Sequence, residues 1–458
     1  MLNDEGRKEA NYLIKLQSII LSLRRENLDI SVQMVLESTY LHSNDRKKQF
    51  VHNLIVILTC RPFMVDIIAE FVRLILIQND DPELRKILLR SISLPSHSHQ
   101  PHLNFFRFYI DKGMFDPQDV VNELIYFSEI YPAHFFNHCV LYAWFAPEIE
   151  QISPSHKEKI FEMVSNNEFP SFIKDFFDDY EEIRSNDFSK WKELLTNHGN
   201  EIKKAIETDD IDLFVQLISY SPTIVNEYLI PSVFDYASIL QNFPLPIHYA
   251  AYCASFKIFK FLILSTPRLS VMDKMAISLP SYSIAGGNFS IIRLLEESEE
   301  SFEGSLLSAA EFFRYEIFEW LFRKYPDTDY STQMSSHIHK CAASGNIRSL
   351  LFCLDNSISA NFHLSIGWTP LHLAARSGQS DVVRILRHYE GIDINVQDQK
   401  GWTPLHWAVH DCHPNTVRLL LQHPRVMINI KNDDGVLVSF FRLLFIGLLK
   451  MDILTSYL

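Results

Sequence analysis

Apolar residues recur every three or four positions along most of this chain. Within the first 196 residues such stripes run through Tyr12–Leu23, Phe50–Leu58, Val65–Ile77 and Val120–Phe127. This spacing places apolar side chains on one face of an α-helix, whereas a half-buried strand would require strict alternation. Proline, asparagine and aspartate residues separate the stripes, and these residue types end helices or form turns. The pattern therefore predicts a helical N-terminal domain over residues 1–196, built from short helices and tight turns.

From residue 197 onward the pattern changes to pairs of short helices. A residue suited to a sharp turn ends the first helix of each pair, and an apolar second helix follows. The predicted turn residues are Asp209, Ala254, Gly287, Phe313, Gly345, Gly378 and Cys412. Apolar second helices are predicted at Ile211–Ile218, Phe256–Leu264, Phe289–Leu295, Tyr315–Phe322 and Ile347–Leu354.

The intervals between these turn residues are 45, 33, 26, 32, 33 and 34 residues. The interval of 45 predicts an insertion at Ile224–Asn242, and the interval of 26 predicts a shortened loop. Phe313 and Cys412 stand at positions that favour glycine, because a left-handed backbone strains residues with a side chain. We therefore expect distorted or different turns in those two pairs.

Two nearly identical stretches, GWTPLHLAA at Gly367–Ala375 and GWTPLHWAV at Gly401–Val409, begin 34 residues apart. The threonine suits a helix N-cap, and the proline that follows suits the first helical position. This combination resembles the ankyrin repeat, a hairpin followed by two antiparallel helices with a period near 33 residues. The resemblance implies that His372 and His406 form hydrogen bonds within and between repeats, and that the repeats stack into a solenoid.

The expected fold class is therefore all-α, with a helical N-terminal domain followed by an ankyrin-repeat α-solenoid whose loops are β-hairpins. We expect degenerate repeats over residues 197–330, clearer repeats over 331–435 and an apolar tail over 436–458. Part of the chain also resembles a repeat-containing domain of unknown function found in expanded ankyrin families of certain protists. The matching segments are Ala205–Ser219, Ile247–Ile263, Ser283–Leu295 and Ala309–Phe322. That resemblance implies protein–protein interaction and supplies no catalytic residues.

The ankyrin resemblance also predicts where a partner would bind, because the hairpin tips and first helices of such arrays face a common groove. The variable positions there are Ile366, Trp368, Arg376, Ser377, Gln399, Lys400, Trp402, His410 and Asp411. Trp368 and Trp402 each follow a hairpin glycine, so we expect them on the same face in adjacent repeats. Tryptophan and arginine are enriched where binding energy concentrates. The alternative is that both rings only cover neighbouring hairpins. Trp407 replaces the Leu373 position and is expected in the core.

Charge and composition favour a protein partner. The chain carries 56 acidic residues against 42 lysines and arginines, a net charge of −14. Nucleic-acid affinity comes largely from neutralising phosphates with basic residues, so this balance argues against such a partner. No apolar run reaches the roughly 20 residues that span a bilayer, and the first residues are polar, unlike a secretory signal. Six scattered cysteines without paired spacing predict reduced thiols and a cytoplasmic location.

Familiar catalytic and nucleotide-binding motifs are absent from the sequence, so we expect no catalytic residues, no cofactor and no metal. The stretches His97–His102 and His410–His413 contain ligand types, but neither has the four well-placed ligands of a structural zinc site. The favoured function is a non-enzymatic scaffold or adaptor that holds a protein in the concave ankyrin groove. The alternative is an enzyme or regulatory subunit with an unrecognised site in the N-terminal helical domain, with the array as substrate selector.

The segment after Gly435 breaks the repeat pattern. Val436–Leu449 is apolar nearly throughout, although a terminal repeat needs a polar outer face. Three interpretations stay open: a degenerate capping repeat, a helix that adheres to a partner or a membrane surface, or a coding sequence truncated or mistranslated after Gly435.

Overall fold

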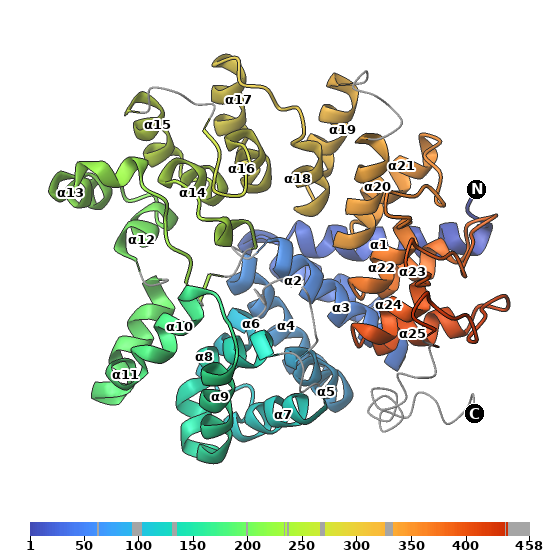
Figure 1. Ribbon diagram of the computed structural model, residues 1–458, viewed down its shortest axis with the longest axis horizontal. Helices are drawn as coiled ribbons and strands as arrows, with labels where there is room; N and C mark the ends of the chain where they lie inside the picture. The colour runs from blue at the N-terminus through green and yellow to red at the C-terminus, as the bar shows by residue number, and fades with distance from the viewer. Residues whose placement is uncertain are drawn as a thin grey trace. The chain divides into compact units, whose positions relative to one another are not determined.

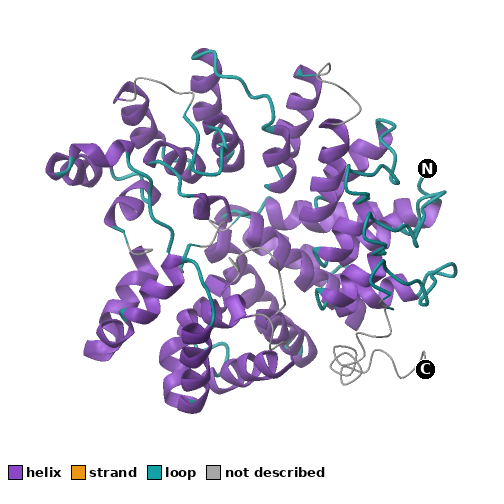
Figure 2. Ribbon diagram, in the orientation of Figure 1, coloured by secondary structure: helices purple, strands orange, loops and turns teal. Residues whose placement is uncertain are grey.

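The computed structural model is all-α, as the sequence predicts, and loops and turns join its helices (Figures 1 and 2). It describes residues 1–458 except 62–63, 94–102, 131–134, 198–199, 233, 236–237, 266–270, 326–332, 436 and 438–458. Within the described residues, extended pairing is limited to three isolated bridges, Leu2 with Tyr389, Met272 with Ser278 and Lys431 with Leu437. No helix in this part of the chain is long and apolar enough to cross a bilayer.

Contacts divide the chain into two compact units, which we describe separately. Unit 1 comprises Met1–His97, Glu129–Tyr131 and Ala310–Leu458, and unit 2 comprises Ser98–Ser128 and Pro132–Ala309. The helices expected in one N-terminal domain therefore contribute to both units. The domain boundaries expected at residues 196, 330 and 435 stay predictions.

Unit 1 combines helices from both ends of the chain. The N-terminal group is α1 (Asp4–Leu21), η1 (Arg25–Asn27), α2 (Leu28–Leu36), η2 (Thr39–Leu41), α3 (Asn44–Cys60), α4 (Val65–Asn79), α5 (Pro82–Arg90) and η4 (Ser91–Ser93). The C-terminal group is α19 (Tyr315–Lys324), α20 (Gln333–Ser344), α21 (Ile347–Asp355), α22 (Pro370–Arg376), α23 (Ser380–Leu386), α24 (Pro404–His410) and α25 (Pro414–Leu421). Helix α18 (Leu306–Glu311) crosses the boundary between the units.

Unit 2 is built around a buried central helix, α8, which contacts α6, α9, α10 and α11. Its first helices are α6 (Leu103–Asp111), α7 (Pro117–Ile130), α8 (Phe135–Ile152), α9 (Pro154–Asn166), α10 (Ser171–Asp178) and α11 (Tyr180–Asn197). The remaining helices are α12 (Glu201–Glu207), α13 (Ile211–Tyr220), η5 (Pro222–Asn226), η6 (Ser238–Asn242), α14 (Pro246–Cys253), α15 (Phe256–Ser265), α16 (Leu279–Gly286) and α17 (Phe289–Glu297).

Seven helix pairs, from α12 and α13 to α24 and α25, follow the predicted period. All seven predicted turn residues have the left-handed backbone conformation, with φ between 51° and 78°. In every pair the second helix begins two residues after the turn residue. The predicted insertion at Ile224–Asn242 contains most of η5 and all of η6.

The expectation of a distorted or different turn at Phe313 and Cys412 is wrong. Both residues adopt the turn that glycine adopts elsewhere, with φ of 53° and 60°. This conformation costs a non-glycine residue about 1 kcal/mol, and burial of the two side chains offsets that cost. Phe313 packs with Val56 and Cys60 of α3, and the Arg61 guanidinium donates a hydrogen bond to its carbonyl at 3.0 Å.

Helices α1 and α3 pack against the second helices of the unit 1 repeats. Helix α1 contacts α21 and α23, and an α3 side chain reaches Asp381 on α23. At the start of the chain, the Asn3 N–H donates to the His388 carbonyl at 3.2 Å. A Cβ at Gly6 would lie only 2.7 Å from the Cβ of His388, so α1 approaches the repeats too closely for a larger residue there.

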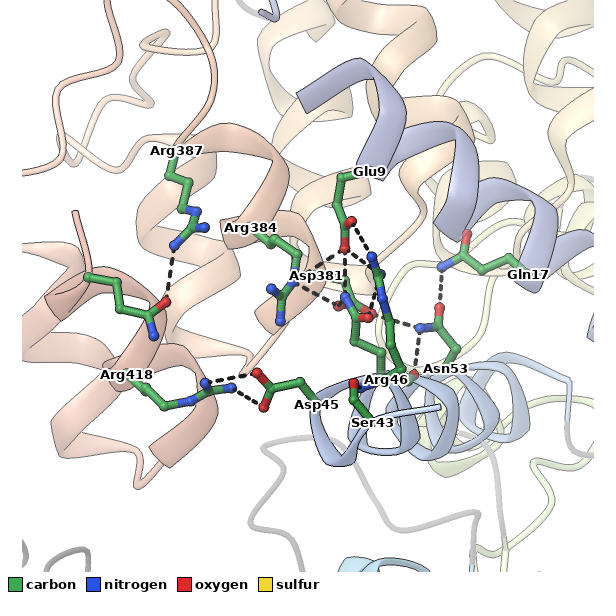
Figure 3. A network of polar contacts seen from close by, with 12 residues as sticks. Glu9, Gln17, Ser43, Asp45, Arg46, Asn53, Asp381, Arg384, Arg387 and Arg418 are labelled. Atoms are coloured by element: carbon green, nitrogen blue, oxygen red, sulfur yellow. Dashed lines mark hydrogen bonds and ion pairs between the residues drawn. The ribbon is translucent and has the colours of Figure 1, made fainter. Parts of the chain in front are cut away.

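A buried polar network holds α1 and α3 on α23 (Figure 3). Asp381 accepts hydrogen bonds from Asn53 Nδ2 at 2.7 Å and from Gln49 Nε2 at 3.3 Å. Gln17 of α1 donates to Asn53 Oδ1 at 2.9 Å and to the carbonyl of Gly345 at 3.0 Å. These side chains are buried, so each polar group needs its partner to offset the loss of water.

Charged groups extend the same network along α1. Glu9 accepts hydrogen bonds from Arg46 at 3.0 and 3.1 Å and from Gln49 at 2.8 Å, and lies 3.6 Å from Arg384 Nε. Burial raises the pKa of Glu9, but these hydrogen bonds and the two arginine charges outweigh burial and lower it overall. Glu9 and Asp381 balance the charges of Arg46 and Arg384, which allows four ionised groups to share one poorly solvated site.

Two features singled out in the sequence lie outside the described residues. They are the His97–His102 stretch and, apart from Leu437, the apolar tail over 436–458. The three interpretations of the tail therefore stay open.

Candidate partner-binding surface

The two hairpin loops that carry the predicted tryptophans lie side by side. The Gln399 N–H donates to the Ile366 carbonyl across the loops at 3.2 Å. Within each loop the hairpin glycine N–H donates to a carbonyl three residues earlier, at 2.8 and 2.9 Å. A Cβ at Gly401, where φ is 71°, would lie 2.9 Å from the backbone nitrogen of Asp433 in the next loop. Glycine therefore permits the close stacking of the loops.

Buried histidines fix the backbone at each of these tryptophans. The Thr369 N–H donates to His372 Nδ1 at 3.1 Å, which assigns the proton of the neutral ring to Nε2. His372 Nε2 lies 3.0 Å from the Trp402 carbonyl in the next repeat and donates to it. His339 makes the same contact with the Trp368 carbonyl at 2.9 Å. Hydrogen bonding within and between repeats is thus confirmed for His372.

Burial of neutral histidines predicts a loss of stability in mild acid. Burial lowers the pKa of His372, on α22 of unit 1, and of His248, on α14 of unit 2, from 6.5 to about 4. Between these values the unfolded chain binds protons that the folded chain does not, so the stabilising contribution is complete above pH 6.5 and disappears as the pH falls toward 4. We expect each histidine to lower the free energy of unfolding by about 2 kcal/mol between pH 7 and pH 5.

Urea unfolding across this pH range measures the effect. His372→Gln should reduce the loss of unfolding free energy between pH 7 and pH 5 by the contribution of one histidine. An unchanged pH dependence would contradict the burial of His372 as a neutral ring.

Asp398 orients the indole rings. Its Oδ2 atom accepts from the indole N–H of Trp368 at 2.9 Å and from that of Trp407 at 3.0 Å. Its Oδ1 atom accepts from the backbone N–H groups of Lys400 and Trp402, both at 2.9 Å. The carboxylate is buried, with Asp398 6% exposed. One carboxylate thus fixes two rings and the loop that carries the third.

The three tryptophans form a continuous aromatic surface. Trp407 lies between the other two, with ring centroids 5.1 Å from Trp368 and 4.7 Å from Trp402. The His410 ring is 5.2 Å from that of Trp402. The Arg376 guanidinium lies 4.9 Å from the Trp368 centroid and 5.2 Å from that of Trp407. We call these five residues the tryptophan patch; four are half-buried and His410 is exposed.

The other predicted positions surround the patch. Ile366, Gln399 and Lys400 are exposed in the hairpin loops, and Ser377 is half-buried at the C-cap of α22. Asp411 is instead buried, at 3% exposed. Its Oδ1 atom lies 2.6 Å from His410 Nδ1, and its Oδ2 atom lies 3.7 Å from Arg376 Nε. The structure therefore places Asp411 behind the patch, where it orients two patch residues.

Two members of this arrangement were not predicted as site residues. Trp407 was expected in the core and is instead half-buried, as is Leu373, its equivalent in the preceding repeat. The available signal was that Trp407 precedes His410 by about one turn of the same helix. Asp398 gave no comparable signal, because its role depends on where the indole nitrogens point.

The side chains of the His410–His413 stretch take part in repeat contacts. His413 Nε2 lies 2.8 Å from the Arg376 carbonyl, and Cys412 Sγ lies 3.7 Å from the His410 carbonyl. Among the residues that the structure describes, no group of three His, Cys, Asp or Glu side chains is arranged to hold a metal ion.

Comparison with protein families supports the repeat assignment. Residues 306–398 and 338–434 match the family model for ankyrin repeats (3 copies), and these ranges contain helices α18 to α25. No curated relative matches the sequence. The likeness of Ala205–Phe322 to the protist family stays a prediction. The chain thus contains ankyrin repeats, and such repeats have a general role in protein–protein interaction.

Proposed function

We propose that this protein is a non-enzymatic adaptor that binds a partner protein through the hairpin and first-helix side of its C-terminal repeats. The tryptophan patch is the observation that carries the proposal. Asp398 holds the rings of Trp368 and Trp407, and the Trp402 ring packs on Trp407 and His410. The three rings therefore lose little freedom when a partner binds. Rigid tryptophan and arginine side chains at partly exposed positions are the residues on which binding energy concentrates.

The packing of α1 and α3 on the repeats supports the hairpin side as the binding surface. Helices α1 and α3 of the same chain already pack on the second helices through the Asp381 network. A partner of the unit 1 repeats therefore meets the hairpin loops and first helices. The predicted residues Ile366, Gln399 and Lys400 would extend the contact beyond the patch. Ser377 would contact the partner at the edge of the patch. Asp411 would act from behind the patch by orienting His410 and Arg376. A cytoplasmic location and the absence of enzyme activity remain parts of this proposal.

The double variant Trp368→Ala with Trp402→Ala should weaken partner binding at least tenfold, because it removes two large anchors from the centre of the surface. A partner can be identified by photo-crosslinking from a benzoylphenylalanine placed at Lys400, then purified for calorimetry. Lys400→Glu, at an exposed position, provides a second variant that leaves the ring contacts in place.

Trp320→Ala is the matched control, because Trp320 is a half-buried tryptophan on the second helix α19. It should change the Kd less than twofold. Normal binding by the double variant and by Lys400→Glu, with circular dichroism unchanged, would exclude the hairpin side as the binding surface.

A further inference from the structure

A second candidate site lies in unit 2, among residues with no assigned role. A cavity of about 450 Å³ opens between α10, α11 and the segment that follows α13. Its lining is mostly apolar, with Phe172, Phe176 and Ile183 on the helices and Tyr228, Ile230 and Phe234 on the segment. A volume of this size is typical of sites that enclose a ligand or an anchoring side chain.

The segment that forms one wall is held firmly in place. Lys203 and Asp235 form an ion pair at 2.7 Å with both side chains 1% exposed, and the Ser232 N–H donates to the same carboxylate at 2.7 Å. The Leu229 N–H donates to the Pro244 carbonyl at 2.8 Å. The Phe234 ring meets Phe176 edge-on with centroids 5.9 Å apart. Groups on α10 and α12 therefore hold this wall of the cavity in place.

The mouth of the cavity is apolar and acidic. Tyr228 and Ile230 remain 42% and 65% exposed there. Asp175 and Asp179 on the helix side and Glu227 on the segment side are exposed carboxylates that line the opening. Lys190 is the basic residue of the lining, and its amine already contacts Glu182. On the segment side, the Lys274 ammonium lies 5.2 Å from the Tyr228 ring centroid. Most of the excess negative charge at the opening therefore comes from Asp175 and Asp179 on the helix side, and Glu227 adds a carboxylate on the other wall.

We propose that this cavity binds a basic peptide segment of a second partner protein, with one apolar side chain inserted and lysine or arginine residues on either side. An apolar anchor would bury the exposed surface of Tyr228 and Ile230. Carboxylates on both walls would attract cations that precede and follow the anchor. The same charge would repel anionic lipid headgroups and nucleic-acid phosphates. This site uses no residue of the repeat surface proposed above, so each proposal can fail without the other.

The test uses the full chain and a fluorescein-labelled peptide with a central leucine between two Lys-Arg pairs. Two comparison peptides replace the leucine with glycine or the basic residues with glutamate. Fluorescence anisotropy should show saturable binding of the first peptide, at least tenfold weaker binding of the second and no binding of the third. Binding of the first peptide should also weaken with added salt.

Charge reversal at the mouth tests the location. The double variant Asp175→Lys with Glu227→Lys should weaken binding at least tenfold. The control is Glu297→Lys with Glu303→Lys, which makes the same change in net charge at exposed sites. This control should weaken binding less than twofold. Ile230→Ser should weaken binding about fivefold, and Leu264→Ser, at a residue 81% exposed elsewhere in unit 2, should have no effect.

Several outcomes would overturn the proposal. They are equal binding of the leucine and glycine peptides, equal loss in the two charge-reversed proteins, or no binding of the leucine peptide. Binding of the apolar dye ANS, lost in Ile230→Ser, without any peptide binding would assign the cavity to a small apolar ligand instead. All substituted positions are exposed, and circular dichroism confirms folding of each variant.

Discussion

Asp381→Ala is expected to reduce the stability of unit 1 by about 3 kcal/mol, because removal of one member of a buried charged network leaves the others uncompensated. Asp381 is 3% exposed and bonds with Asn53 and Gln49 of α3. Its loss leaves Arg46 and Arg384 with Glu9 as their only acid in the network of Figure 3. We expect α1 and α3 to detach from the repeats before the repeats themselves unfold.

Hydrogen exchange measured by mass spectrometry can resolve this order. Peptides from α1, α3 and α23 should lose protection in Asp381→Ala, while peptides from α8 in unit 2 keep theirs. Asp355→Ala is the matched control, since Asp355 is an exposed acid on the neighbouring second helix α21. Unchanged protection of α1 and α3 would show that the network does not hold them on the repeats.

Lys203→Met is expected to destabilise unit 2 by about 3–5 kcal/mol, the usual cost of leaving one member of a buried ion pair alone. The Asp235 carboxylate would then keep the Ser232 N–H as a partner but lose its counter-charge. Denaturant unfolding followed by circular dichroism and by the fluorescence of buried Trp191 measures the loss. Lys204→Met is the control, because this neighbouring lysine is exposed.

Adding Asp235→Asn to Lys203→Met should restore more than half of the lost stability. The asparagine carbonyl can still accept from Ser232, and no charge remains buried. Similar stability of Lys203→Met and the wild type would mean that water reaches this pair. The cavity wall would then be less rigid than the proposed peptide site requires.

The repeat fold could be predicted because its signals are local. A turn residue, a two-residue step and an apolar stripe recur within each helix pair, and the left-handed turns at Asp209 and Phe313 follow the same spacing as those at Gly345 and Gly378. The side-by-side hairpins could be predicted for the same reason, since equivalent positions in adjacent repeats must stack.

The packing of α1 and α3 could not be predicted from local patterns. Its determinants are polar residues such as Asn53 and Asp381, which are 328 positions apart in the chain. On separate helices each would be expected to face water. Their burial depends on a complementary group that only the folded chain supplies. Asp398 was missed for a similar reason, because indole orientation is not encoded in spacing.

The pairing of the first helices with the last repeats also constrains synthesis of the protein. When a ribosome has completed α1 and α3, the Asp381 carboxylate that they bind has not yet been made. More than 300 further residues must be translated before α1 and α3 can form this contact. Contacts between residues so far apart in the chain slow folding and leave apolar surface exposed in the meantime. A nascent chain that stalls before the repeats would therefore leave α1 and α3 as prime targets for chaperones.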